Sequence, residues 1–72
     1  MPAIPSISGR DAAKVFRSFG WRVIRHGNHI IMVKDGQIIS LSIPDHKEVA
    51  RGTLRNIIRD AGLTVAEFVA AI

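Results

Sequence analysis

Residues 21–44, WRVIRHGNHIIMVKDGQIISLSIP, decide the fold, because they hold three short apolar stretches separated by turn residues. Apolar and polar side chains alternate along these stretches, which is typical of strands with one buried face. Gly27-Asn28 predicts a tight turn, since both residue types tolerate positive φ. Asp35-Gly36 predicts a two-residue hairpin, and Pro44 cannot donate to a ladder and should end the sheet. We therefore expect three antiparallel strands, at residues 21–26, 29–34 and 37–43.

The alternation also predicts which side chains face the core. In the first strand Trp21, Val23 and Arg25 share one face and Arg22, Ile24 and His26 the other, and we expect the face with Trp21 to be buried. In the third strand the apolar face consists of Ile39, Leu41 and Ile43, and Ser40 and Ser42 lie on the opposite face.

A helix should precede the sheet. Ser8-Gly9-Arg10-Asp11 has the Ser-x-x-acid spacing of a capping box, in which a side-chain oxygen and a carboxylate satisfy free amides of the first turn. Gly20 should end this helix. Its apolar residues recur at i, i+3, i+4 and i+7, at Ala12, Val15, Phe16 and Phe19.

Two helices should follow the sheet. The first is expected over residues 53–61, with Gly62 as its C-cap. The second begins at another capping box, Thr64-Val65-Ala66-Glu67. It should turn four apolar side chains inward, namely Val65, Phe68, Val69 and Ile72.

The element order is then α-β-β-β-α-α, an α+β fold with a three-stranded antiparallel sheet. No repeat or linker interrupts the sequence, so we expect residues 1–72 to form one domain. The absence of cysteine excludes a disulfide framework and fits a reducing compartment. Residues 1–5 do not resemble a signal peptide, and no stretch approaches the roughly 20 apolar residues that span a bilayer. We expect a soluble, cytoplasmic protein with no membrane partner.

The charge balance favours a polyanionic partner. Ten Lys and Arg against six Asp and Glu give a net charge of +4 and a pI near 10.8, as in many nucleic-acid-binding domains. Arg51, Arg55 and Arg59 recur every four residues and should form a stripe opposite the apolar side of their helix. This stripe is either a solvated face or a track of phosphate contacts, which Lys47 would extend.

Three histidines lie in or beside turns. His26 and His29 flank Gly27-Asn28, and His46 follows Pro44-Asp45. Imidazole both takes and gives a proton near neutral pH. RNA supplies its own nucleophile, the 2′-hydroxyl, so a ribonuclease needs a proton acceptor, a donor and a group that steadies the phosphate. One histidine can suffice, although a histidine at a turn edge is more often an ordinary surface residue.

A zinc site is the competing use of these histidines, because imidazole is a common zinc ligand. The spacing argues against it. His26 and His29 lie on opposite sides of a chain reversal, and only Asp45 could complete an obvious ligand set. We therefore expect no metal and no other cofactor.

Three segments together carry motifs of a known family. Residues 8–21 look like a family's first helix and its Gly-aromatic junction, and residues 25–29, RHGNH, look like its Arg-x-x-Gly-Ser-His segment. Residues 43–63 are similar to its Pro-x-His, Gly-Thr-Leu and Ile-x-x-x-Ala-Gly pattern, and Glu67-Phe68 also fits. On these motifs the chain resembles the HicA, or YcfA-like, family of mRNA-cleaving toxins. Asn28 stands where the family usually has serine, and an amide can likewise donate and accept a hydrogen bond.

The resemblance implies a double-stranded-RNA-binding-like fold and a cytoplasmic toxin of a type II toxin–antitoxin pair. It implies cleavage of mRNA without a metal, neutralisation by a HicB antitoxin, and His29 as the catalytic acid or base. We assign RNA binding to Arg25, Asn28, His46, Lys47, Arg51 and Arg55. Two alternatives stay open: a non-catalytic RNA-binding module of the same fold, and a protein-interaction domain whose basic face meets an acidic partner.

Overall fold

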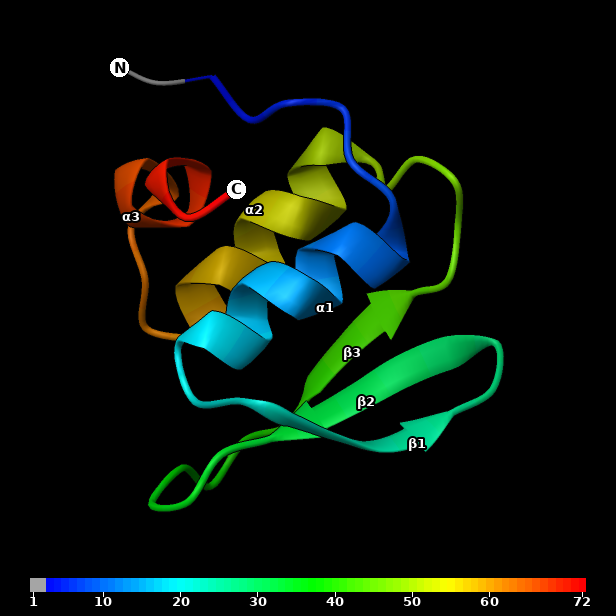
Figure 1. The fold of residues 1–72 in the computed structure, drawn as a ribbon, viewed down its shortest axis with the longest axis vertical. Coiled ribbons are helices and arrows are strands. Elements are labelled where there is room, and N and C mark those ends of the chain that lie inside the picture. Colours follow the sequence, from blue (N-terminus) through cyan, green and yellow to red (C-terminus); the bar gives the residue numbers. More distant parts are fainter. Residues whose placement is uncertain (1–2) are drawn as a thin grey trace.

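A computed structural model describes residues 3–72 and has the expected order of elements (Figure 1). Three antiparallel strands form one sheet in the order β1-β2-β3. The α+β class is thus confirmed. The elements are α1 (Gly9–Ser18), β1 (Arg22–His26), β2 (His29–Val33), β3 (Leu41–Pro44), α2 (Arg51–Asp60) and α3 (Val65–Ala70).

The helices cover one face of the sheet and leave the other uncovered. α1 packs against all three strands, and α2 packs against β3 and α3. Along β2, Ile30 and Met32 are buried whereas His29 is exposed, and neighbouring side chains of a strand point to opposite faces. We call the uncovered side the open face; by alternation and register it carries Arg25, His29, Ile31 and Ser42.

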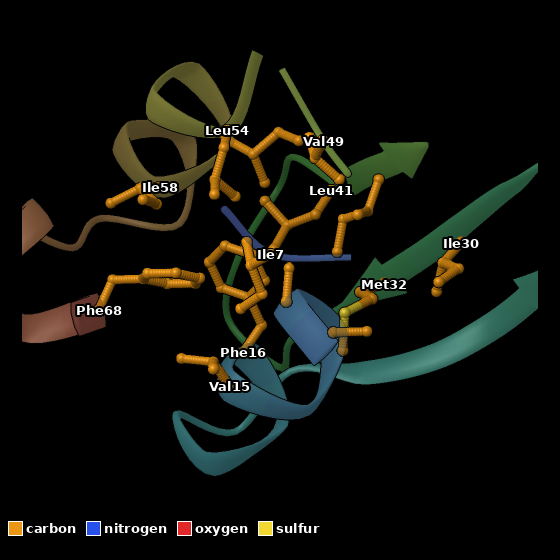
Figure 2. Close-up of a cluster of buried hydrophobic side chains, with 14 of the residues drawn as sticks. Ile7, Val15, Phe16, Ile30, Met32, Leu41, Val49, Leu54, Ile58 and Phe68 are labelled. Carbon is orange, nitrogen blue, oxygen red and sulfur yellow. The ribbon is translucent and has the colours of Figure 1, made fainter. Parts of the chain in front are cut away.

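The core lies between the helices and the covered face of the sheet (Figure 2). Phe16 of α1 and Phe68 of α3 are fully buried, with ring centroids 5.1 Å apart and a tilt of 47° between the rings. Such tilted aromatic pairs are favourable. Trp21 is also buried, which confirms its predicted core position. The sheet and α2 supply the other large side chains, among them Ile30, Met32, Leu41, Ile43, Leu54 and Ile58.

The starts of α1 and α3 follow the capping signals. The Glu67 amide donates to Thr64 Oγ1 over 3.1 Å, and Glu67 Oε1 accepts from the Thr64 amide over 2.9 Å, so the capping box of α3 is confirmed. At α1, Ser8 Oγ accepts from the Asp11 amide. The Asp11 carboxylate instead lies 3.8 Å from Lys14 Nζ, so only half of that box forms.

Both long helices end at glycines with positive φ, 97° at Gly20 and 76° at Gly62. After α2 the Gly62 amide donates to the Arg59 carbonyl and the Leu63 amide to the Ile58 carbonyl. These two bonds form a Schellman motif, which satisfies the last carbonyls of the helix. α2 begins earlier than the predicted residue 53. Among residues 3–72 the helices are too short to cross a bilayer.

The third strand is shorter than predicted. Residues 34–40 form a loop instead of a two-residue hairpin, because Met32 pairs with Leu41. Gly36 does adopt the positive φ, 83°, that the turn signal predicts. Ile39 is 46% exposed, so its predicted place on the buried face was wrong. The turn signal acts locally, whereas the register is set by which side chains reach the core.

The predicted buried face of β1 was also wrong, since all five residues of this strand are exposed. A bulge between Val23 and Arg25 shifts the register against β2, and a bulge bends an edge strand and re-aims its side chains. The buried aromatic group at this edge comes from Trp21, which precedes β1.

Two smaller expectations also need correction. The chain reverses at Gly27-Asn28 as predicted, but neither residue has positive φ, so tolerance of positive φ does not explain the turn. Ile72 is 62% exposed rather than turned inward, because α3 ends at Ala70 and the last residues lie beyond the helix.

Candidate functional site

His29 lies on the open face at the end of the β1–β2 hairpin. An open depression there is lined by Arg25, Gly27, Asn28, His29 and Ile31. Arg25 pairs with Ile31 across the strands, so Arg25 and His29 occupy diagonal positions on the same face. Diagonal neighbours are about 7–8 Å apart, within reach of long side chains. An imidazole and a guanidinium can therefore approach the same bound phosphate.

His46 and Lys47 line a second depression, together with Ser8, Arg10 and Asp45. The Asp45 carboxylate lies 2.9 Å from His26 Nε2 and accepts from Arg10 Nε over 3.2 Å. These hydrogen bonds, that of His26 first, lower the pKa of Asp45 below its ordinary value. Asp45 is thus ionised at neutral pH.

Backbone pairing joins the segments that line the two depressions. His29 pairs with Pro44 in the β2–β3 ladder. The next residue, Asp45, donates its amide proton to the Asn28 carbonyl over 3.2 Å. The turn that carries His29 is therefore bonded to the segment that carries His46. Five of the predicted site residues lie around this junction: Arg25, Asn28, His29, His46 and Lys47.

Arg51 and Arg55 line neither depression. They lie on the exposed side of α2, because Leu54 and Ile58 turn the opposite side of the helix into the core. Within residues 3–72, no ion pair involves these two arginines or Arg59. The predicted basic stripe is therefore present, with guanidinium groups free to bind anions, but it forms a surface separate from the depression at His29.

The histidines are not gathered in one place. His26 pairs with buried Ile30, so by alternation it lies on the face opposite to His29. Among residues 3–72 no group of three or more His, Cys, Asp or Glu side chains could hold a metal ion. Asp45, considered from the sequence only as a metal ligand, bonds instead to His26 and Arg10. No local spacing indicates this network, since Arg10 and Asp45 are 35 residues apart.

Fold and site together define a class of protein: a small basic α+β domain with a histidine on the open face of its sheet. A family model described as the HicA toxin of bacterial toxin–antitoxin systems matches residues 9–63. This chain therefore belongs to the HicA toxin family.

A solved structure agrees with this membership. It is described as a toxin–antitoxin complex from Streptococcus pneumoniae and contains a chain with 32% sequence identity and a TM-score of 0.70. The similarity covers 79% of the present chain and 98% of that chain, so the shared fold extends over most of the present chain. Comparison with curated proteins gave no significant match.

Proposed function

We propose that this chain is the toxin of a type II toxin–antitoxin pair and acts in the cytoplasm as a single-domain, metal-independent endoribonuclease on mRNA. The observation that carries the proposal is the exposed imidazole of His29 beside Arg25 in one depression of the open face. Membership of the HicA toxin family supports the same activity.

His29 acts as the general base in the proposed reaction. It accepts the proton of a ribose 2′-hydroxyl while the 2′ oxygen forms a bond to the neighbouring phosphorus. The bond from phosphorus to the 5′ oxygen breaks, and that oxygen takes a proton from His46 or from water. Arg25 stabilises the charge that develops on the phosphate oxygens. Proton transfer by a positioned side chain typically contributes about 10²–10⁴-fold to the rate.

Other residues of the proposed interface bind RNA without entering the reaction. The Asn28 side-chain amide can donate to a phosphate or accept from a nucleobase, and Lys47 lies in the second depression. Arg51 and Arg55 would hold phosphates farther along the strand, because they lie on the separate surface of α2. Contacts to phosphate give affinity without sequence preference.

The test compares wild type with His29→Ala on an unstructured RNA in excess EDTA. We expect wild type to cleave and His29→Ala to lose activity by about 100-fold or more, with RNA affinity little changed. Ser42→Ala is the matched control, because Ser42 is an exposed residue of β3 on the same open face. This variant should cleave like wild type. Both variants need circular dichroism spectra like that of wild type.

Each other outcome contradicts a definite part of the proposal. Equal cleavage by wild type and His29→Ala would remove His29 from the mechanism. Cleavage by wild type only without EDTA would refute metal independence. If neither protein cleaves but both bind RNA, the protein is a non-catalytic RNA-binding module, which the free arginines of α2 would suit.

We also propose a HicB-like antitoxin as partner. The similar Streptococcus pneumoniae chain comes from a toxin–antitoxin complex, and the net charge of +4 here suits an acidic surface. Co-expression with a HicB-like gene product should yield a stable complex by size-exclusion chromatography with light scattering. The same product should stop RNA cleavage. A product that binds RNA but not this chain would count against the partnership.

A further inference from the structure

The turn that carries His29 has no support from side-chain packing. Every residue from Arg22 to His29 is exposed. A Cβ built on Gly27 would meet nothing within 4 Å. The conformation of this turn therefore depends on hydrogen bonds. The Gly27 amide donates to the His29 carbonyl over 3.1 Å, and the Asn28 carbonyl accepts from Asp45 over 3.2 Å.

Asp45 joins the turn to the rest of the fold through both its backbone and its side chain. Its amide bonds to Asn28, and its carboxylate lies 2.9 Å from His26 Nε2, at the other side of the turn. Arg10 of α1 donates to the same carboxylate through Nε and Nη2, over 3.2 and 3.4 Å. The side chain of Asp45 is 20% exposed, against 42% for His26 and 71% for Arg10.

Asp45 is itself held firmly, unlike the turn. Ile43 of β3 is fully buried two residues earlier. The Gly9 amide of α1 donates to the His46 carbonyl over 2.9 Å. Gly9 also lies so close to the Pro44 carbonyl that a Cβ there would overlap with it. The segment at Asp45 is therefore fixed from two sides, and it can hold the exposed turn in place through these hydrogen bonds.

We propose that Asp45 is a positioning residue for His29, acting through His26 and the Asn28 carbonyl. It sets the orientation of the turn and hence the placement of the His29 imidazole relative to Arg25. The inference rests on the proposed function, in which His29 transfers the proton. Asp45 and His26 do not touch the RNA in this role.

The first test measures single-turnover cleavage by Asp45→Asn over a range of RNA concentrations. The asparagine keeps the backbone amide but loses the charge that holds His26 and Arg10 together. A shift of about 1 Å in a catalytic group can cost up to about 100-fold in rate. We expect the maximal rate to fall by about tenfold, with the half-saturating RNA concentration unchanged within about twofold.

Asp35→Asn is the matched control. Asp35 lies 3.6 Å from Arg22 and is 97% exposed, and it belongs to the loop after β2, at the opposite end of this strand from His29. Its substitution removes the same charge from the chain but leaves the His29 turn untouched. A tenfold loss in both variants would show an effect of net charge and overturn the inference.

The second test separates positioning from stability and from direct catalysis by His26. His26→Gln keeps a side-chain N–H that can reach Asp45, whereas His26→Ala does not. We expect His26→Gln to cleave within about twofold of wild type and His26→Ala to lose about tenfold. Because His26 is partly exposed, neither substitution should unfold the protein. Equal loss in both variants would overturn the positioning role.

A third measurement does not require cleavage. Amide hydrogen exchange of the RNA-free protein reports on two hydrogen bonds of the turn. The Gly27 amide donates to the His29 carbonyl, and the Asp45 amide donates to the Asn28 carbonyl. Asp45→Asn should lower the protection of both amides, relative to their intrinsic exchange rates, by about tenfold or more, while the amides of Met32 and Ile43 keep wild-type protection.

The two proposals can fail separately. If wild type does not cleave RNA, the proposed function fails, and accelerated exchange would still show that Asp45 holds the turn. If wild type cleaves and His29→Ala does not, but Asp45→Asn changes neither rate nor exchange, the inference alone is overturned.

Discussion

Replacing Gly9 by alanine tests the contact between α1 and the end of β3. Gly9 is the first residue of α1 and is buried. An added Cβ would overlap with the Pro44 carbonyl oxygen and lie 3.0 Å from its carbonyl carbon and 3.2 Å from the Asp45 Cα. All of these are backbone atoms, which no change of rotamer can move. The helix or the strand end must therefore shift.

Two opposing effects determine the size of the change. Alanine favours a helix over glycine by up to about 1 kcal/mol, and less at the first position. Forcing an extra carbon into a packed site costs typically about 1–3 kcal/mol, and the lost bond from the Gly9 amide to the His46 carbonyl costs about 1 kcal/mol more. We expect the variant to be less stable by about 2 kcal/mol, a large part of the roughly 3–5 kcal/mol expected for a core of this size.

Thermal unfolding followed by circular dichroism measures the effect. In a domain of this size, about 2 kcal/mol corresponds to a melting temperature lower by about 8–16 °C. Gly52→Ala is the matched control, since Gly52 lies in α2 and a Cβ there meets nothing within 4 Å. That variant should be as stable as wild type or more stable by up to about 1 kcal/mol. If Gly9→Ala also melts at or above the wild-type temperature, the close contact does not exist.

Three further predictions concern the core, the basic stripe and the pH dependence of stability. Phe68→Ala removes a fully buried ring and should lower the free energy of unfolding by about 3–5 kcal/mol. A urea titration at 25 °C should then show much of the variant unfolded before urea is added. Replacing Arg51 and Arg55 together by glutamine should weaken binding of single-stranded RNA and make the slope of log affinity against log salt shallower by about 1.4; an unchanged slope would exclude these contacts. The pKa of Asp45 is lowered from 3.8 by His26 and Arg10, so its stabilising effect is complete above that value and lost as pH falls through the folded-state pKa. The melting temperature of wild type should therefore fall more steeply below about pH 4 than that of Asp45→Asn.

The helices were predictable because their signals are local. Spacing of apolar residues and capping groups predicted all three, and the Thr64 capping box formed as expected. The strands were less predictable, since the burial of a strand depends on segments distant in sequence. The Asp35-Gly36 turn signal was obeyed in backbone conformation at Gly36, yet it did not set the pairing of β3. Ile39 is exposed for that reason.

The candidate site was predictable in composition but not in arrangement. The sequence nominated Arg25 and His29, and they share one depression. It also nominated Arg51, which lies on a separate surface of α2. The sequence could not reveal this, because the distance from a helix to a strand end cannot be read from spacing along the chain. The network around Asp45 was missed, since it forms only when α1, β1 and the segment after β3 come together.

The division of the sheet into a covered and an open face has a consequence for how such sequences diverge. Ile30 and Met32 are fixed by the core, whereas their neighbours His29 and Ile31 have no helix above them. Substitutions at exposed positions of the open face such as Ser42 therefore change that surface at little thermodynamic cost. Sequences that share this core can therefore differ on the open face with little effect on the free energy of folding.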